Sequence, residues 1–401
     1  MIIPLERVFH ERERSNTWKD YYNELRKQAI IKTVDKASKV AIANRRLNRY
    51  SDVLPYDSNR IVLKSGADSY INASYVEYAR SGQRYIIAQG PMDITCHHFW
   101  RMIWQHNVSN IVMLCKVVEN QKCKCAQYWP ASVAKDMSFD EFTISLLTCS
   151  LSSEYNISTF KISNSKDKEG SERTINHFHY HAWPDFGIPD SPDSFLKFLC
   201  LVRQQNAVHS PPPVIHCSAG IGRSGVYAVC DIIIQLLQDL PEGEWSSISL
   251  DEILLSLRLQ RVGLIQAPDQ LRFTFKSILR AKQIMLDKEW PSKFLQTHAS
   301  DDEFSDSDMP APPPPLKGHA KPQVAANGDV AMNGDVTSKS ELRQRKHQET
   351  ATKVADIRKR MKANENSQQF WNNYWPHFMG IGALMLGTCA YLYFSRTSSL
   401  I

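Results

Sequence analysis

The sequence predicts a folded α/β domain followed by a tail of different composition. Short apolar runs of strand length alternate with longer amphipathic segments, and strands mixed with long helices favour a sheet flanked by helices. The chain has 401 residues, of which 42% are hydrophobic, enough for one large core. Composition changes sharply near Trp290. We therefore expect a folded domain over residues 1–290, a linker over 291–370 and a C-terminal segment over 371–401.

Apolar periodicity assigns the main elements of the folded domain. The first helix is expected after Ser15 and Asn16, polar residues that suit a helix start. The predicted strands are 111–118, 175–180 and 213–215, and the predicted helices are 18–30, 194–205, 226–237, 253–259 and 270–285.

Charge and cysteine content exclude several kinds of function. A net charge of +6 is too small for a nucleic-acid-binding surface, and residues 1–300 contain no basic stripe with interleaved aromatic residues. The nine cysteines lack the spacing of a disulfide framework, so we expect free thiols in a reducing compartment. Cys123 and Cys125 have no matching second pair, which argues against zinc.

The linker is expected to be disordered, because its composition cannot bury enough apolar surface to fold. It contains an acidic stretch at 300–308, a proline-rich stretch at 310–317 and a basic stretch at 339–362. The segment from Pro312 to Lys317 fits a P-x-x-P-x-K ligand of SH3 domains, and a stiff spacer fits it equally well.

An uncharged run of 17 residues, Phe378 to Phe394, lies near the C-terminus. As a helix it would be about 26 Å long, close to the ~27 Å core of the reticulum bilayer. Aromatic residues flank both ends, and lysine and arginine lie mainly upstream, which places the folded domain in the cytosol. We expect a transmembrane tail anchor in the endoplasmic reticulum, with the mitochondrial outer membrane as an alternative. A buried core helix is the other interpretation, but it would have nothing to pack on beyond a disordered linker.

The most informative segment is the glycine-rich loop between the strand 213–215 and the helix 226–237. From His216 to Gly225 it reads His-Cys-Ser-Ala-Gly-Ile-Gly-Arg-Ser-Gly. Glycine lets backbone N–H groups turn toward one point and the helix N-terminus adds a positive dipole end, which suits a dianion such as phosphate. Cys217 would lie at its base as a thiolate and Arg223 would bind two phosphate oxygens, which indicates nucleophilic attack on phosphorus. A buried cysteine in an ordinary strand–helix loop is the alternative.

At this motif the sequence resembles the classical protein tyrosine phosphatases, whose signature is His-Cys-x5-Arg-Ser/Thr. The resemblance extends from about residue 17 to about residue 286 and is strongest to the reticulum-anchored, non-receptor type 1 and type 2 enzymes. It implies a highly twisted mixed sheet, and hydrolysis of phosphotyrosine in proteins such as tyrosine kinases and receptors. The reaction would pass through a phosphocysteine on Cys217 and need no metal or cofactor. Phosphate would be bound by Arg223 and by the loop residues Ser218, Ala219, Gly220, Ile221 and Gly222.

A leaving phenolate needs a proton, so a carboxylic acid on a mobile loop is required. Residues 181–189 contain two prolines and a glycine around Asp185, and Trp183 would anchor the hinge. The string Trp-Pro-Asp-Phe-Gly resembles the family's closing acid loop, rather than a loop with a capping aspartate. By resemblance Asp185 gives the proton and then acts as base toward water, and Phe186 contacts the substrate.

The resemblance also assigns the second chemical step. Gln266 would position the attacking water with help from Gln270. Ser224 would donate a hydrogen bond to the Cys217 sulfur, or cap the following helix, or both. His216 is not expected to be a base, because in a strand its ring points away from its neighbour's side chain; by resemblance it tunes the thiolate from behind.

Selectivity for phosphotyrosine requires a deep pocket, since a shallow cleft would also admit phosphoserine. The segment Asn-Arg-Tyr-Ser-Asp-Val around Tyr50 resembles the family's substrate-recognition loop. Tyr50 would form the pocket wall, Val53 would line it, and Asp52 would accept hydrogen bonds from the peptide backbone. Lys124 would reach toward the phosphotyrosine, and Glu119 matches the carboxylate that holds the signature arginine. The alternative for Tyr50 alone is an ordinary core tyrosine, and the alternative for each charged residue alone is a solvated surface charge without a role in binding.

Two further arginines match a secondary phosphate site of the subgroup. Arg26 and Arg258 stand at the matching positions, and Gly263 would leave the site open. This suggests tolerance of doubly phosphorylated substrates such as kinase activation loops, and two surface arginines are the alternative. Ser51 stands where related enzymes often carry a basic residue, so a preference for acidic flanking residues should be weaker.

Two other classes of function stay open. A catalytically weak, phosphotyrosine-binding scaffold is one, although Cys217, Arg223, Asp185 and Gln266 are all present. A dual-specificity or phosphoinositide phosphatase is the other, and Tyr50 argues against its shallow pocket. An accessible thiolate is readily oxidised, so redox control is also expected.

Overall fold

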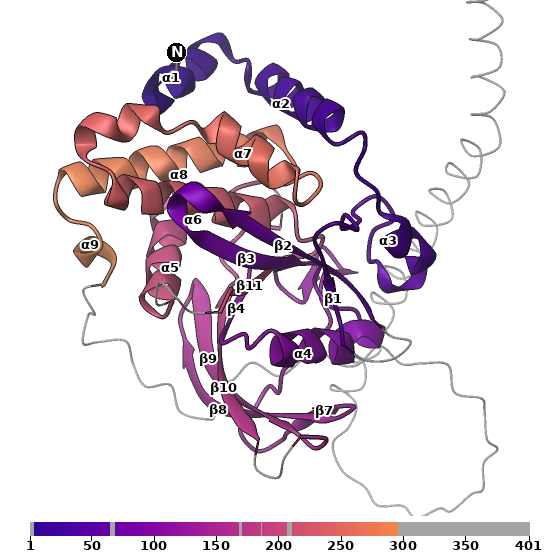
Figure 1. Cartoon of the computed structure of the whole chain (residues 1–401). Helices are drawn as coiled ribbons and strands as arrows, with labels where there is room; N and C mark the ends of the chain where they lie inside the picture. Colours follow the sequence, from indigo (N-terminus) through magenta and orange to yellow (C-terminus); the bar gives the residue numbers. More distant parts are fainter. Residues whose placement is uncertain (1–3, 65–68, 168–170, 186, 207–210, 296–401) are drawn as a thin grey trace, which may run out of the picture. The chain divides into compact units, whose positions relative to one another are not determined.

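A mixed sheet of nine strands crosses the described part of the chain, which in this computed structural model comprises residues 4–64, 69–167, 171–185, 187–206 and 211–295 (Figure 1). The order across the sheet is β1-β2-β3-β11-β4-β10-β9-β8-β7. A separate hairpin pairs β5 with β6. The strands are β1 (Arg60–Val62), β2 (Tyr70–Tyr78), β3 (Gln83–Ala88), β4 (Asn110–Met113), β5 (Val118–Glu119), β6 (Lys122–Cys123), β7 (Met137–Phe139), β8 (Phe142–Leu151), β9 (Tyr155–Asn164), β10 (Glu172–Tyr180) and β11 (Val214–His216).

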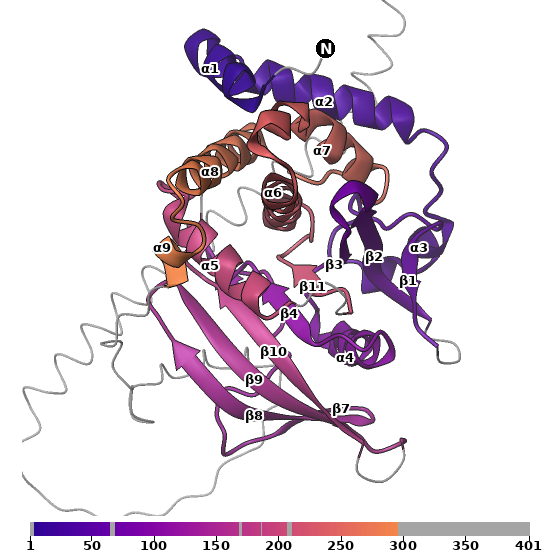
Figure 2. The ribbon, with the colours of Figure 1, turned by 60° about the vertical axis from the view of Figure 1, so that its left-hand side comes forward.

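Parallel pairing occurs at the centre of this sheet. β11 pairs in parallel with β3 on one side and β4 on the other, and β4 pairs in parallel with β10. The outer strands pair antiparallel. Strand direction turns progressively from β2 to β8 (Figure 2), so the expected twisted mixed sheet is confirmed. The carboxyl end of β11 lies between two parallel neighbours, the place where α/β sheets bind ligands.

Helices cover both faces of the sheet. α5, α6, α7 and α8 gather on one side and α4 lies on the other (Figure 2). α6 is buried around most of its circumference, as its continuous apolar sequence requires. The helices are α1 (Leu5–Ser15), α2 (Trp18–Lys32), α3 (Lys39–Ala43), α4 (Cys96–Gln105), α5 (Asp193–Gln204), α6 (Gly222–Asp239), α7 (Leu250–Arg258), α8 (Pro268–Leu286) and α9 (Ser292–Leu295), with 3₁₀ turns at Arg45–Leu47, Ala79–Ser81, Asp93–Thr95 and Glu242–Ser247.

The predicted helices are confirmed as α2, α5, α6, α7 and α8, with differences at their starts. α7 begins before the predicted residue 253 because Ser249 Oγ accepts a hydrogen bond from the Glu252 N–H (3.3 Å) and caps it. α6 begins at Gly222, before the predicted residue 226. Gly225 lies inside it because a Cβ there would stand 2.4 Å from Ile265 N, so a close approach outweighs helix propensity.

The predicted strand 111–118 is too long. β4 ends at Met113. The next residue, Leu114, still donates its N–H to His216 O of β11 (2.9 Å), but its carbonyl oxygen accepts from the Arg223 side chain (3.0 Å). The chain then leaves the sheet and enters the β5–β6 hairpin. Apolar periodicity alone does not show where the chain leaves the sheet. It also left unassigned α1, α4 and several strands, among them β2, β3, β8 and β9.

The first residues of the predicted linker are described and contain α9, whose Phe294 is buried, so the folded part extends beyond the predicted boundary at residue 290. The rest of the predicted linker and the predicted membrane anchor lie outside the described residues. Among the residues that are described, none forms a helix that is both long and apolar enough to cross a bilayer.

Candidate active site

The loop between β11 and α6 turns its backbone N–H groups inward. Every carbonyl oxygen from Ser218 to Ile221 accepts a hydrogen bond from outside the loop. The donors, in order along the loop, are Gly90 N (2.9 Å), Arg261 Nη2 (3.1 Å), Arg261 Nε (2.7 Å) and Ile265 N (2.9 Å). Because the C=O and N–H of one peptide point in opposite directions, the amides face the space inside the loop. In the part of the chain described, none of the backbone N–H groups from Ser218 to Ile221 donates to another group, so all are available to an anion bound inside the loop. We call this loop the cradle.

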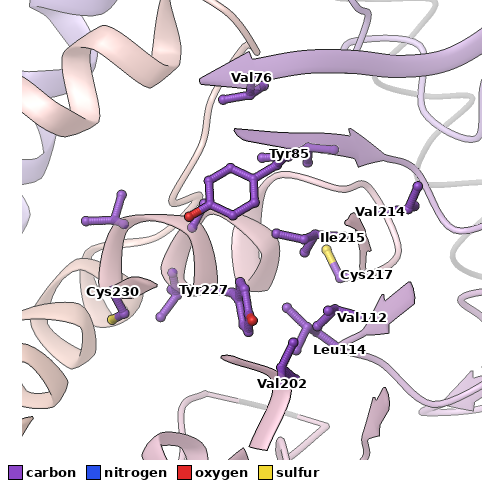
Figure 3. Close-up of a cluster of buried hydrophobic side chains, with 14 of the residues drawn as sticks. Val76, Tyr85, Val112, Leu114, Val202, Val214, Ile215, Cys217, Tyr227 and Cys230 are labelled. Atoms are coloured by element: carbon purple, nitrogen blue, oxygen red, sulfur yellow. The ribbon is translucent and has the colours of Figure 1, made fainter. Parts of the chain in front are cut away.

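Cys217 lies at the base of this cradle, at the edge of the hydrophobic core. Figure 3 shows its sulfur beside Ile215 at the end of β11, close to Val112 and Leu114. The residue is only 5% exposed. The inward N–H groups of the loop and the N-terminus of α6 therefore surround the place where a bound anion would meet this sulfur.

Arg223 is fixed by Glu119 and by the backbone carbonyls of Leu114 and Pro184. Its guanidinium forms a bidentate pair with Glu119, Nη1 to Oε1 at 2.5 Å and Nη2 to Oε2 at 3.0 Å. Burial opposes its charge, but the hydrogen bond and the charge of Glu119 raise the pKa of Arg223 above its usual value. Nη2 also donates to Pro184 O (3.4 Å), so the arginine touches the segment that contains Asp185. The structure thus brings together the predicted Arg223 and Glu119.

His216 is held behind Cys217 as a neutral ring. Its Nδ1 lies 3.2 Å from Cys217 O, and a carbonyl can only accept, so Nδ1 carries the proton. Nε2 then accepts from the Tyr128 hydroxyl (2.7 Å), whose oxygen in turn accepts from His177 Nε2–H (2.8 Å). Burial lowers the pKa of His216 to about 3. The ring therefore orients the Cys217 backbone and has no proton-accepting nitrogen directed at the substrate.

Asp185 lies against the β5–β6 hairpin in this structure. Its Oδ2 accepts the Asn120 N–H (3.1 Å) and its Oδ1 lies 3.6 Å from Lys116 Nζ. Trp183 is buried, donates Nε1–H to Gly187 O (3.2 Å) and packs on Phe195 and Phe273, which suits a hinge anchor. The side chain of Asp185 is about one-third exposed (34%), so the loop can carry it without unfolding the core. The predicted contact residue Phe186 is outside the described residues.

Gln266 and Gln270 lie over the start of α6. A Cβ on Gly222 would stand 3.0 Å from Gln270 Nε2 and 3.4 Å from Gln266 Oε1, so both side-chain amides lie close to the backbone of Gly222. Gln270 Oε1 accepts the Gln266 N–H (2.9 Å). Ile265 before them has φ +58°, a conformation that costs a β-branched residue about 1–3 kcal/mol and is found mainly at functional sites.

Ser224 does not form the predicted hydrogen bond to the Cys217 sulfur, nor does it cap α6. Its hydroxyl is buried and has no partner among the described residues. The reason is its position inside the first turn of α6, where the free N–H groups point toward the cradle and not toward the side chain. An unpaired buried hydroxyl stays available to a sulfur that becomes a leaving group.

Tyr50 is attached to the phosphate-binding loop by a hydrogen-bond relay. Ser218 Oγ donates to Lys124 O (2.9 Å), so the Tyr50 hydroxyl must donate to Ser218 Oγ (3.0 Å). This fixes the ring as a wall beside the cradle. Asp52 is exposed and Val53 is buried, and both line a cavity next to this wall.

That cavity has a volume of 380 Å³ and contains all three residues of the predicted secondary site, Arg26, Arg258 and Gly263. Arg26 is exposed, whereas Arg258 is only 2% exposed, so the alternative of two surface arginines is wrong. Arg258 donates to Leu264 O (2.9 Å) and Ile265 O (3.0 Å) and thereby also supports the segment that leads to Gln266.

Sequence reasoning missed three residues that build the site. Arg49 joins the Tyr50 loop to Gly90 O (3.0 Å) and Pro91 O (2.6 Å). Arg261 holds the cradle carbonyls, and Asn72 contacts Arg261 (3.1 Å). One sign in the sequence was a polar residue between apolar ones, as in Ile71-Asn72-Ala73, which suggests a buried polar side chain. The sequence does not show which residues such a side chain would contact.

The described ranges contain no cluster of histidine, cysteine or carboxylate side chains placed to hold a metal ion. The functional groups of the site are a thiol, a guanidinium, a ring of amides, a carboxylic acid and two side-chain amides. This set can bind a dianion, attack it and move one proton.

A buried thiol at the base of an anion-binding loop, where a strand with two parallel neighbours ends, points to a phosphatase. The profile described as Protein-tyrosine phosphatase matches residues 44–280, and the chain belongs to this family. It is 36% identical to tyrosine-protein phosphatase non-receptor type 2 of Rattus norvegicus over 95% of this chain and 93% of the relative. The human protein of that name is 35% identical over 95% of each chain.

Tyrosine-protein phosphatase non-receptor type 61F of Drosophila melanogaster is 35% identical over 76% of this chain and 56% of its own length. These matches confirm the expected subgroup, the classical non-receptor protein-tyrosine phosphatases similar to type 2. The chain is accordingly a protein-tyrosine phosphatase that acts on phosphotyrosine proteins.

Proposed function

We propose that this enzyme hydrolyses phosphotyrosine in two steps through a phosphocysteine. The observation that carries the proposal is the cradle itself: inward amides, a buried Cys217 at its base and Arg223 fixed at its rim. In the first step the Cys217 sulfur forms a bond to phosphorus and the P–O bond to the phenol breaks. Asp185 gives the leaving oxygen its proton.

In the second step water replaces the sulfur. Gln266, with Gln270, orients the water over phosphorus, Asp185 takes its proton, and the S–P bond breaks to return thiolate and inorganic phosphate. Ser224, whose hydroxyl is unpaired, donates to the departing sulfur. For both steps Asp185 must leave Lys116 and Asn120 and turn toward the cradle, so loop closure precedes chemistry.

The depth of the pocket selects phosphotyrosine. Tyr50, whose hydroxyl is hydrogen-bonded to Ser218 Oγ, forms a wall beside the phosphate-binding loop, and an aryl phosphate reaches deeper past such a wall than the shorter phosphoserine does. The test is hydrolysis by the full chain, without added metal, of one peptide carrying phosphotyrosine and its twin carrying phosphoserine. We expect vanadate-sensitive turnover of the first peptide, at least about a hundredfold faster than of the second. Comparable turnover of both would favour the dual-specificity class, and binding without turnover would favour the scaffold.

The substrates we propose are tyrosine kinases and receptors, including doubly phosphorylated activation loops. The support for the latter is that Arg26 and the buried Arg258 share one cavity with Asp52 and Gln266, next to the catalytic cradle. Ser51 leaves the recognition loop without a cation at that point, so acidic flanking residues should be favoured less.

We further propose that Phe378 to Phe394 anchors the enzyme in the endoplasmic reticulum membrane with the phosphatase domain in the cytosol. The support is the length and aromatic flanks of this uncharged run. In this scheme the catalytic domain extends through α9 to residue 295, and the residues from there to 370 form a linker, whose segment Pro312 to Lys317 serves as an SH3 ligand or a stiff spacer.

A chain that ends at Asn366 should move from the membrane fraction to the cytosol. Leu384→Arg in the full chain should do the same, because one charge at the centre of a span costs about 2.5–3.5 kcal/mol, whereas Leu384→Phe should stay on membranes. Fractionation and microscopy against reticulum and mitochondrial markers give the readout. Continued membrane association of the shortened chain would contradict the anchor.

A further inference from the structure

Arg261 is a fully buried arginine behind the phosphate-binding loop. It follows α7 in the chain, its exposed fraction is 0%, and within the described residues its hydrogen bonds go to uncharged acceptors. Nε donates to Gly220 O (2.7 Å), and Nη2 donates to Ala219 O (3.1 Å) and Asn72 Oδ1 (3.1 Å). Nη1 donates to Ser74 Oγ (3.2 Å).

Like the buried Arg258, but unlike Arg223 and Arg203, this cation has no carboxylate within ion-pair distance in the part of the chain described. Arg223 pairs with Glu119 and Arg203 pairs with Asp231. Burial lowers the pKa of Arg261 to about 10, and the groups that oppose this are Cys217 and Tyr70. A buried charge without a counter-ion is costly, and the negative charge that can meet this one is the thiolate or the bound phosphate.

The hydrogen bonds of Arg261 set the direction of two loop amides. Its guanidinium lies outside the loop and binds the carbonyl oxygens of Ala219 and Gly220, so these two carbonyls point outward. In a planar peptide the N–H points opposite to the C=O, so the N–H groups of Gly220 and Ile221 point into the cradle. Gly220 has φ +70°, and a Cβ there would stand 3.0 Å from Arg261 Nη2 and 2.0 Å from Ala88 O. The loop therefore bends around the arginine at the one residue that allows it.

Asn72 extends this arrangement to the substrate-recognition loop. Its Oδ1 accepts from Arg261, while its Nδ2 donates to Asn48 Oδ1 (2.9 Å) and to Val53 O (2.7 Å). Asn48 and Val53 flank Tyr50 in the chain. The Arg261 guanidinium thus contacts the phosphate-binding loop directly, and it contacts the Tyr50 loop through the side-chain amide of Asn72.

We propose that Arg261 is a positioning residue of the phosphatase: it aims the Gly220 and Ile221 amides at the phosphate, supplies a second positive charge beneath it and, through Asn72, sets the depth of the Tyr50 wall. This inference rests on the proposed function. The charged and titratable groups that face Cys217 are Arg223 from α6, Arg261 from the segment after α7, Cys115 from the end of β4 and His216 from β11. Cys115 and His216 are neutral, since burial raises the pKa of the first and lowers that of the second.

Arg261→Lys keeps the charge and loses the fork, and Arg261→Met loses both. We expect the Lys variant to bind orthovanadate about tenfold more weakly, and the Met variant to do so more weakly still. We expect alkylation of Cys217 by iodoacetate at pH 6 to slow in the Met variant and to stay near wild type in the Lys variant, because only the former removes the charge. Calorimetry measures vanadate binding and mass spectrometry measures alkylation, and neither measurement depends on catalytic turnover.

Asn72→Ala separates the two roles of Arg261. It leaves the contacts between Arg261 and the cradle in place, so vanadate affinity and alkylation should stay within about twofold of wild type. The KM for a phosphotyrosine peptide should rise about fivefold, and kcat should change little, because only the wall is loosened.

Arg203→Lys is the matched control, a buried arginine paired with Asp231 away from the cradle. It should lower the melting temperature and leave vanadate binding unchanged. Folded Arg261→Lys protein with wild-type vanadate affinity would overturn the proposal and make Arg261 purely structural. If the wild type itself bound no vanadate, the proposed function would fail first, so the two failures are distinguishable.

Discussion

Cys217→Ser should abolish turnover and keep phosphotyrosine binding. A serine hydroxyl at this position has no base to ionise it, since His216 is neutral and directs its nitrogens to Cys217 O and Tyr128. We expect kcat to fall at least about a thousandfold. The amides of the loop and Arg223 remain, so the Kd for a phosphotyrosine peptide should stay within about threefold of wild type or become tighter, because thiolate–phosphate repulsion is gone.

Phosphate release and fluorescence polarisation with a labelled peptide measure the two effects. Cys230→Ser is the control, because Cys230 is a buried thiol on α6 outside the cradle (Figure 3). It should retain turnover per folded molecule. Residual turnover above about one per cent of wild type in Cys217→Ser would show that another group attacks phosphorus.

Asp185→Ala should trap substrates. Without the proton donor the phenolate leaves poorly, so kcat should fall about 10²–10⁴-fold while the peptide still binds. The loss should be smaller for an aryl phosphate whose phenol is strongly acidic, since that leaving group needs little help.

Asp190→Ala is a suitable control, because Asp190 is an exposed carboxylate shortly after the same loop and forms no ion pair with another described residue. Kinetics with both aryl phosphates and pull-down of phosphotyrosine proteins from pervanadate-treated cells report the effect. Equal turnover by Asp185→Ala and wild type would show that the proton comes from elsewhere.

The chemical residues could be predicted from the sequence because each belongs to a short contiguous string. Cys217 and Arg223 lie in one loop whose glycines and flanking strand and helix already specify an anion cradle. Asp185 lies in a string punctuated by proline and glycine. Gln266 and Glu119 needed the family resemblance, because a single glutamine or glutamate has no local pattern that assigns its role.

The supporting residues could not be predicted, because their roles depend on contacts between distant segments. Arg261 and Asn72 meet across 189 positions of the chain, and Arg223 and Glu119 across 104. The exit of the chain from the sheet after Met113 was missed for the same reason, since it depends on hydrogen bonds to β11 and α6. The contact of Asp185 with Asn120 and Lys116 could not be predicted either, because it depends on where the β5–β6 hairpin lies relative to the Asp185 loop.

The most direct test of the central claim is to quench the full-length enzyme with acid during the first turnover of a phosphotyrosine peptide and locate the phosphoryl group by mass spectrometry. The account predicts phosphate on Cys217, more of it in Gln266→Ala, where water is poorly placed, and none in Cys217→Ser. A phosphoryl group on any other residue, or phosphate release by Cys217→Ser at the wild-type rate, would contradict it.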